Sequence, residues 1–529
     1  MTTLAGSTDT LTRDALAVLQ PSFLGTEPPD WVLRRLDEGL TGVGLFGRNI
    51  ENPEQVARLT ARLRAARPDV LVAMDEEGGD VTRLEVRTGS SFPGNLALGA
   101  VDDPGLTRAV ARELGRRLAE VGVNLDWAPS ADVNSNPDNP VIGARSFGAD
   151  PALVARHTAA YIEGLQDAGV SACAKHFPGH GDTNVDSHHA MPRIDVPVEV
   201  LRERELVPFR AAIAAGTKAV MSAHILLPAL RTDVPATVSP AVLTGLLRAP
   251  VADGGLGFTG LIITDALEMQ AIAATYGIEG GAVRAVAAGA DAMCIGARGD
   301  EEIVLRTRDA LVAAVRSGDL PEERLADAAA RVRALAAWSA SASASAAAAS
   351  GAVEGIAPDP GVGQAAARRA LRVTGAEGYE PPAGPVYVAG FTPVASIAVG
   401  QETPWGVGAE LERELPGTES AVFDGSALGA GDGGSGDPAS REGLSALTAN
   451  VLAAARDRRI VAVVRDVHRH PWMADALDAL LAARPDTVVV EMGVPQAPPR
   501  GAPHIATHGA ARVCGRAAAE VITGKGAGA

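Results

Sequence analysis

The stretch VLVAMD, residues 70–75, sets the pattern that decides the fold. It is a short apolar run that ends in one polar residue, and a helical pattern follows it. Similar runs recur along the first 300 residues: VNLD (123–126), CAKH (173–176), AVMSAH (219–224), LIITD (261–265) and ADAMCIG (290–296). Continuous apolar runs of this length are typical of strands that are buried on both faces, as in a parallel sheet.

The segments between these runs carry helix signals. Asp103-Pro104 and Asp150-Pro151 each place an N-capping aspartate before a first-turn proline. Two further apolar runs lie upstream, near residues 16–23 and 43–46. Eight strands that alternate with helices predict an α/β fold of the (β/α)8 barrel type, and an open doubly wound sheet is the structural alternative.

An alanine- and serine-rich stretch divides the chain. WSASASASAAAASG, residues 338–351, has no periodic apolar face and favours a linker, with an exposed alanine-rich helix as the alternative. We therefore expect a catalytic barrel over residues 1–337, a linker over 338–353 and a second domain over 354–529. Because apolar runs and helical patterns also alternate in that last part, it is predicted to be a smaller αβα sandwich. Its expected elements are strands at 386–391, 460–466 and 487–492 and a helix at 474–483.

The composition limits the partners. Lys and Arg number 47 and Asp and Glu number 64, so the formal net charge is −17. This acidic balance argues against nucleic acid or an anionic membrane as partner, because both need a basic surface. The three cysteines (Cys173, Cys294 and Cys514) fit neither a disulfide framework nor a thiolate zinc site. With no signal-peptide pattern and no membrane-length apolar run, we expect a cytoplasmic protein; a monomer is compatible with the sequence.

Polar residues end five of the predicted strands: Asp75, Asp126, His176, His224 and Asp265. In a parallel barrel the carboxyl ends of the strands surround the active site, so these residues are expected to meet at one rim. For Asp265 the alternative is an N-cap of the next helix, since aspartate often takes that position.

The stretch KHFPGHGDTNVDSHHAMP, residues 175–192, gathers four of the ten histidines of the chain. Its glycines favour a loop that leaves a strand. Three interpretations are open: a solvated polar loop, a zinc site, for which the ligand spacing is poor, and a proton-transfer site. In Asp186-Ser187-His188 the carboxylate can accept an N–H of the imidazole and so fix its tautomer, which leaves the other nitrogen for acid–base work near neutral pH.

These motifs resemble those of the family 3 glycoside hydrolases, and within them the two-domain bacterial β-N-acetylglucosaminidases. The resemblance rests on KHFPGHGDT with the following DSH and on TDALEM (264–269), and it extends over most of residues 10–300. Further matching motifs follow in the same order: MDEEGG (74–79), NPVIGARSF (139–147) and MSAHI (221–225). Ordinary family 3 β-glucosidases lack the histidine loop and take their acid/base from a glutamate in a second domain.

The resemblance implies a retaining, exo-acting hydrolase of terminal β-linked N-acetylglucosamine, with no cofactor and no metal. Asp265 would form the covalent glycosyl-enzyme, His188 would protonate the leaving oxygen and then activate water, and Asp186 would orient His188. Contacts to the sugar are implied for a second set: Asp75, Arg83, Arg145, Lys175, His176 and His224. The family often has glutamine at the position of Glu76, so the fine substrate preference is left open.

Other functions stay open at this point. A phosphorylase would use the same residues, a metal-dependent hydrolase would use the histidine loop as ligands, and a non-catalytic protein would only bind sugar. The natural substrate is also open between muropeptides from cell-wall turnover and short chitin oligosaccharides. A small carbohydrate is the expected partner in each case.

Overall fold

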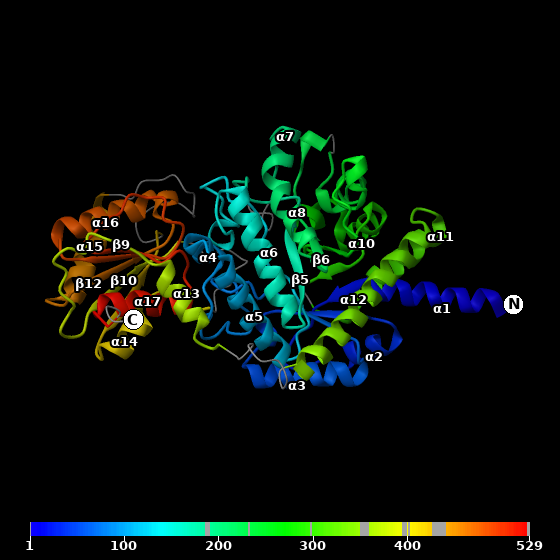
Figure 1. The fold of residues 1–529 in the computed structure, drawn as a ribbon, viewed down its shortest axis with the longest axis horizontal. Coiled ribbons are helices and arrows are strands. Elements are labelled where there is room, and N and C mark those ends of the chain that lie inside the picture. The colour runs from blue at the N-terminus through cyan, green and yellow to red at the C-terminus, as the bar shows by residue number, and fades with distance from the viewer. Residues whose placement is uncertain are drawn as a thin grey trace. The chain divides into compact units, whose positions relative to one another are not determined.

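The computed structural model describes residues 2–185, 191–230, 233–296, 299–349, 359–393, 399, 403–425 and 441–525 (Figure 1). The chain folds into two compact units, and neither unit is one continuous stretch. The first unit comprises Met1–Glu77, Asp103–Ile142 and Gly148–Pro360, and the second comprises Gly78–Asp102, Gly143–Phe147 and Gly361–Ala529.

In its described residues the first unit contains eight strands: β1 (Leu19–Pro21), β2 (Gly42–Leu45), β3 (Leu71–Met74), β4 (Leu125–Asp126), β5 (Ser171–Phe177), β6 (Ala219–Ser222), β7 (Leu261–Thr264) and β8 (Met293–Ile295). Strands β2 to β7 form a parallel sheet in chain order, and β8 pairs in parallel with β1. A parallel bridge between Ile263 and Ala292 joins β7 to β8, and β1 lies against β2. The predicted (β/α)8 barrel and its eight strands are therefore confirmed.

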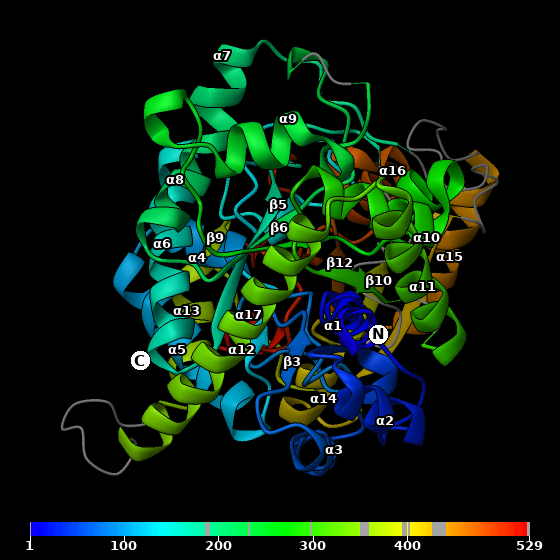
Figure 2. The same cartoon turned by 90° about the vertical axis from the view of Figure 1, so that its right-hand side faces the viewer.

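Helices separate these strands: α1 (Thr2–Ala17), α2 (Asp30–Glu38), α3 (Pro53–Ala66), α5 (Pro104–Glu120), α6 (Pro151–Asp167), α7 (Val198–Val200), α8 (Leu206–Ala214), α9 (Pro240–Val242), α10 (Gln270–Ala288), α11 (Glu301–Ser317) and α12 (Glu322–Ala349). A short π-helix, η3 (Leu201–Glu205), leads into α8. Asp103 and Asp150 cap α5 and α6 as predicted, because their side chains accept hydrogen bonds from Leu106 N and Leu153 N. Helices α6 and α8 pack outside strand β5 (Figure 2).

Helix α12 runs further than the sequence indicated. It continues to Ala349, so the stretch expected as a linker is helical over most of its length. The reason is tertiary packing, since Val332 and Leu335 of the same helix join the buried cluster that fills the barrel. Ser339 is also fully buried, and its hydroxyl lies 2.9 Å from that of Ser171.

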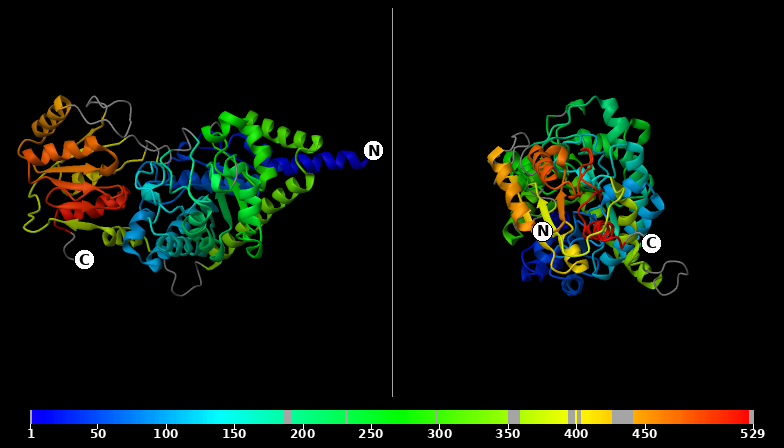
Figure 3. Two further views of the ribbon diagram at one scale, coloured as in Figure 1. Left: turned by 90° about the horizontal axis from the view of Figure 1, so that it is seen from above. Right: turned by 90° about the vertical axis from the view of Figure 1, so that its left-hand side faces the viewer.

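The second unit is a six-stranded sheet between two layers of helices (Figures 1 and 3). The strand order is β11 (Glu419–Phe423), β10 (Tyr387–Phe391), β12 (Ile460–Val464), β13 (Val488–Glu491), β14 (His504–Ala506) and β9 (Arg372–Thr374), with only β9 antiparallel. Its helices are α4 (Asn95–Val101), α13 (Val362–Ala370), α14 (Gly408–Glu414), α15 (Arg441–Ala455), α16 (Pro471–Ala483) and α17 (Arg512–Ile522). The three predicted strands and the predicted helix are present.

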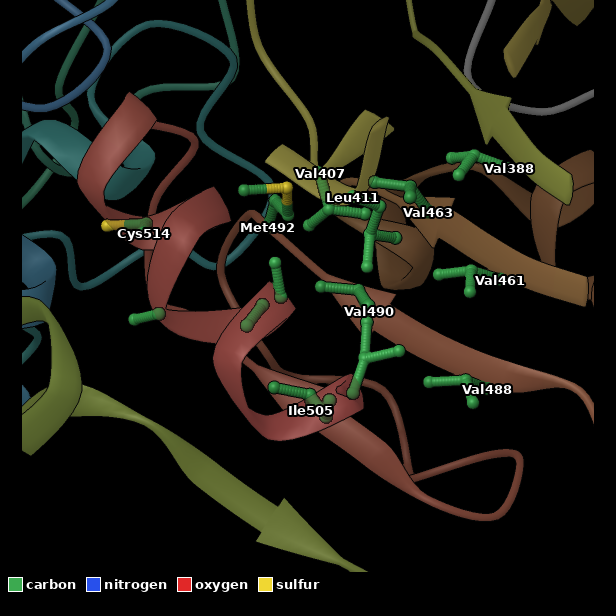
Figure 4. Close-up of a cluster of buried hydrophobic side chains, with 14 of the residues drawn as sticks. Val388, Val407, Leu411, Val461, Val463, Val488, Val490, Met492, Ile505 and Cys514 are labelled. Carbon is green, nitrogen blue, oxygen red and sulfur yellow. The ribbon is translucent and has the colours of Figure 1, made fainter. Parts of the chain in front are cut away.

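Alternate residues of the sheet strands lie in two separate hydrophobic cores. Val461 and Val463 of β12 lie in the core beneath α17, which Figure 4 shows. Ile460 and Val464 lie in the opposite core with α15 and α16. Side chains alternate between the two faces of a strand, so β12 needs apolar residues at every position. The predicted αβα sandwich is therefore observed.

Two segments that follow barrel strands, 78–102 after β3 and 143–147 after β4, pack within the second unit. Asp80 accepts a hydrogen bond from Ala510 N at 2.7 Å and forms a buried ion pair with Arg465. Arg512 of α17 donates to Ser91 Oγ at 2.6 Å. The boundary expected at residue 337 placed both segments in the barrel domain. No local pattern in them indicates that they pack within the second unit.

Candidate active site

The polar residues predicted for the barrel rim are found at the carboxyl ends of neighbouring strands. Asp75 directly follows β3, Asp126 ends β4, His176 lies in β5, and Asp265 directly follows β7. Burial raises the pKa of the Cys173 thiol on β5, and the charges of Asp75, Asp126 and Asp265 act on the same thiol. The three carboxylates therefore lie within electrostatic range of one side chain of the barrel interior.

Lys175 of β5 forms ion pairs with two carboxylates that follow β3. Its side chain is buried, and Nζ lies 2.7 Å from Asp75 Oδ1 and 2.7 Å from Glu77 Oε1. Glu77 is 3% exposed, whereas the Asp75 side chain keeps 18% of its surface accessible. Asp75 is thus the carboxylate of this cluster that can meet a ligand, and Lys175 fixes its position. The sequence predicted Asp75 and Lys175, but it missed Glu77, which lies two residues beyond Asp75 in the same motif.

A second missed residue, Asp132, holds His176. Its fully buried carboxylate accepts hydrogen bonds from His176 Nδ1 at 2.7 Å, from His176 N at 3.1 Å and from His180 N at 2.7 Å. Burial opposes ionisation, but the charge and hydrogen bond of His176 hold the pKa of Asp132 well below its usual range. Because the carboxylate accepts from Nδ1, Nε2 is the ring nitrogen that His176 presents to other groups.

His224, which follows β6, supports the turn that carries Asp265. Its ring is fully buried, with Nδ1 2.8 Å from Thr237 Oγ1 and Nε2 3.0 Å from the carbonyl oxygen of Ala266. Both ring nitrogens therefore have protein partners, and the contact of His224 with the sugar stays a prediction. The capping alternative for Asp265 is wrong, because helix α10 begins at Gln270 and its N-cap is Met269.

Asp126 is the most deeply buried carboxyl group of the rim. It is fully buried, and Oδ1 accepts a hydrogen bond from Glu76 N at 3.0 Å. Burial, reinforced by the charge of Glu76, raises the pKa of Asp126 well above its ordinary value. Asp126 thus lies at the end of β4, where the sequence predicted a rim residue, but it is buried within the protein.

The histidine loop is described as far as residue 185. Asn139 Nδ2 donates to the carbonyl oxygens of His180 and Gly181, each at 2.9 Å, and Arg204 Nη2 donates to Asp182 Oδ2 at 2.5 Å. The stem of the loop is therefore anchored from two sides. The predicted pair Asp186 and His188 lies outside the described residues.

The two predicted arginines are placed differently from the other site residues. Arg83 and Arg145 lie on the segments 78–102 and 143–147, which pack within the second unit. The carbonyl oxygen of Arg145 accepts a hydrogen bond from Asn95 Nδ2 at 2.7 Å. Their contacts with a sugar stay predictions.

In the described part of the chain, no group of three or more His, Cys, Asp or Glu side chains is arranged to hold a metal ion. No helix among the described residues is long and apolar enough to cross a bilayer.

The fold and the strand-end residues define a two-domain protein whose (β/α)8 barrel carries a cluster of polar side chains at the carboxyl ends of its strands. The N-terminal domain of glycosyl hydrolase family 3 matches residues 32–335, more than half of the chain, so the chain belongs to glycosyl hydrolase family 3.

Its relatives carry consistent names. The chain is 35% identical over 338 residues to beta-hexosaminidase A of Pseudoalteromonas piscicida, a match that covers 59% of this chain and 55% of the relative. It is 38% identical over 251 residues to a beta-hexosaminidase of Mycobacterium tuberculosis, covering 47% and 63%. The chain thus spans less than two thirds of the length of these relatives. A solved family 3 beta-N-acetylglucosaminidase from Paenibacillus is 33% identical, covers 97% of each chain and superposes with a TM-score of 0.79.

Proposed function

We propose that this protein is a retaining, exo-acting β-N-acetylglucosaminidase that removes terminal β-linked N-acetylglucosamine from the non-reducing end. The observation that carries the proposal is the cluster of Lys175, Asp75 and Glu77 at the same barrel end as Asp265. An oriented carboxylate and an ammonium group supply an acceptor and donors for sugar hydroxyls, and Asp265 supplies a separate carboxylate for nucleophilic attack.

In the proposed reaction, Asp265 attacks the anomeric carbon while His188 gives a proton to the leaving oxygen. The covalent glycosyl-aspartate is then hydrolysed by water that His188 deprotonates, with Asp186 orienting the imidazole. Retaining enzymes place the two groups about 5 Å apart on opposite sides of the bond that breaks. The anchored stem of the histidine loop, which leads from β5 towards Asp186, supports this role.

Several site residues are proposed to contact the sugar. The accessible carboxylate of Asp75 is proposed to accept hydrogen bonds from sugar hydroxyls, since Lys175 already fixes its orientation. His176 presents Nε2 because Asp132 holds Nδ1. Arg83, Arg145 and His224 are proposed as further contacts, on the family resemblance alone.

An assay with p-nitrophenyl β-N-acetylglucosaminide and the matching β-glucoside in phosphate-free buffer tests this function. We expect release of N-acetylglucosamine, strong preference for the first substrate and no effect of a chelator. Asp265→Asn should reduce kcat at least 10³-fold, roughly the order of a lost nucleophile. Asp253→Asn, an exposed aspartate of the same unit, is the matched control. Substantial turnover by Asp265→Asn would exclude Asp265 as nucleophile.

The same assay with added phosphate separates hydrolysis from phosphorolysis, because N-acetylglucosamine 1-phosphate forms only in the second reaction. Muropeptides and chitin oligosaccharides, offered in parallel, decide the natural substrate class. Participation in cell-wall recycling and the cytoplasmic location stay predictions.

A further inference from the structure

A buried carboxyl group outside the proposed catalytic set lies against the stem of the histidine loop. Glu205, the last residue of η3, is fully buried. A Cβ added at Gly179 would lie 2.7 Å from Glu205 Oε2 and 2.8 Å from its Cβ, so the backbone of the stem packs directly on this side chain. Among the described residues, no hydrogen-bond partner reaches Oε2.

Arg204, the preceding residue, connects Glu205 to the loop. Its Nε donates to Glu205 Oε1 at 2.6 Å, and its Nη2 donates to Asp182 Oδ2 at 2.5 Å. One guanidinium thus bridges the π-helix and the loop stem. The charges that act on Glu205 come from three elements: Arg204 on η3, Asp132 after β4 and Asp182 after β5.

The turn that packs on Glu205 carries one of the proposed sugar-binding residues. His176 begins the turn, Gly179 N donates to the carbonyl oxygen of His176 at 2.8 Å, and His180 N donates to Asp132 at 2.7 Å. A movement of this turn would displace His176.

We propose that Glu205 is a positioning residue: its protonated carboxyl group keeps the turn His176–Asp182 packed, and loss of that proton loosens the turn. The consequence for catalysis rests on the proposed glycosidase function, but the structural part does not.

The electrostatics of the site support this coupling. Burial raises the pKa of Glu205 from 4.5 to about 7, Arg204 lowers it in part, and Asp132 and Asp182 raise it again. An ionised carboxylate beneath Gly179 gains water when the turn opens. The opening equilibrium of the turn should therefore increase as pH rises from about 4.5 to about 7, by at most about 300-fold for this shift.

Hydrogen exchange of the full chain tests the proposal without any need for activity. Peptides that contain Gly179 and His180 are followed from pH 5 to pH 8, with the rates corrected for intrinsic exchange. We expect opening of the wild type to increase from pH 5 to about pH 7 and to level off by pH 8, Glu205→Gln to lose this dependence, and the exposed Glu203→Gln on the same helix to keep it. A wild type without pH dependence, or Glu205→Gln that retains it, would overturn the proposal.

Arg204→Gln provides a second variant in case Glu205→Gln does not fold. Because Arg204 lowers the pKa of Glu205, its removal should move the midpoint of the opening transition above pH 7. An unchanged midpoint contradicts the proposal. In the activity assay, the loss of kcat/KM that opening causes between pH 5 and pH 8 in the wild type should be absent from Glu205→Gln. A wild type that hydrolyses no substrate refutes the glycosidase proposal alone, since the exchange data still decide the role of Glu205.

Discussion

The replacement Asp132→Asn tests how the site orients His176. In the wild type, Oδ1 of Asp132 accepts the two backbone N–H groups and Oδ2 accepts Nδ1–H of the ring. The asparagine oxygen can still accept the backbone groups, but its NH2 group then faces Nδ1. We expect the imidazole to lose the proton on Nδ1 and to keep one on Nε2, so that Nε2 acts as a donor.

The expected magnitude follows from the kind of hydrogen bond that is lost. A hydrogen bond to a charged group contributes about 1.5–3 kcal/mol, so kcat/KM for the p-nitrophenyl substrate should fall by between about 10-fold and about 150-fold. Asp138→Asn is the matched control, because Asp138 is exposed on the same loop. Nitrogen NMR of the histidine rings reports the tautomer directly. A variant with an unchanged tautomer and kcat/KM within about twofold of the wild type would refute this account of His176.

Three further outcomes are expected. Burial raises the pKa of Glu205 to about 7 in the folded protein, whereas its ordinary value of 4.5 holds for the unfolded chain. The free energy of unfolding of the wild type should therefore fall by at most about 3 kcal/mol as pH rises across this range. Urea unfolding at pH 5 and pH 8 should show that Glu205→Gln loses this dependence. Arg465→Met leaves Asp80 buried without its cation and should cost about 3–5 kcal/mol, whereas exposed Arg516→Met should cost less than about 1 kcal/mol, both by urea unfolding. His188→Ala should slow substrates with poor leaving groups far more than activated aryl glycosides; equal losses in steady-state assays would argue against His188 as the acid.

The barrel was predictable because its strands are buried on both faces. Each of these strands must be apolar along its length, and the polar residue that ends it marks the rim. The runs ending at Asp75 and Asp265 therefore identified the strands and part of the candidate site together. Glu77 and Asp132 were missed because each acts through a partner that is distant in sequence, Lys175 and His176 respectively.

The linker prediction shows the limit of local patterns. The alternation of serine and alanine after Trp338 has no amphipathic face, yet helix α12 extends through it to Ala349. The helix is held by residues that precede the stretch, such as Leu335, and by the burial of Ser339. A local pattern cannot report that another part of the molecule covers a serine.

The sequence by itself determined the alternation of strands and helices, the αβα character of the second part and the strand-end positions of the polar residues, because strand burial and helix capping are local consequences of residue order. Tertiary structure decided which polar groups pair. It brought Asp75 and Glu77 to Lys175, placed Glu205 beneath Gly179, and packed two segments from between the barrel strands into the second unit. These pairings join residues that are far apart in the chain, and their energies depend on burial, which exists only once the chain has folded.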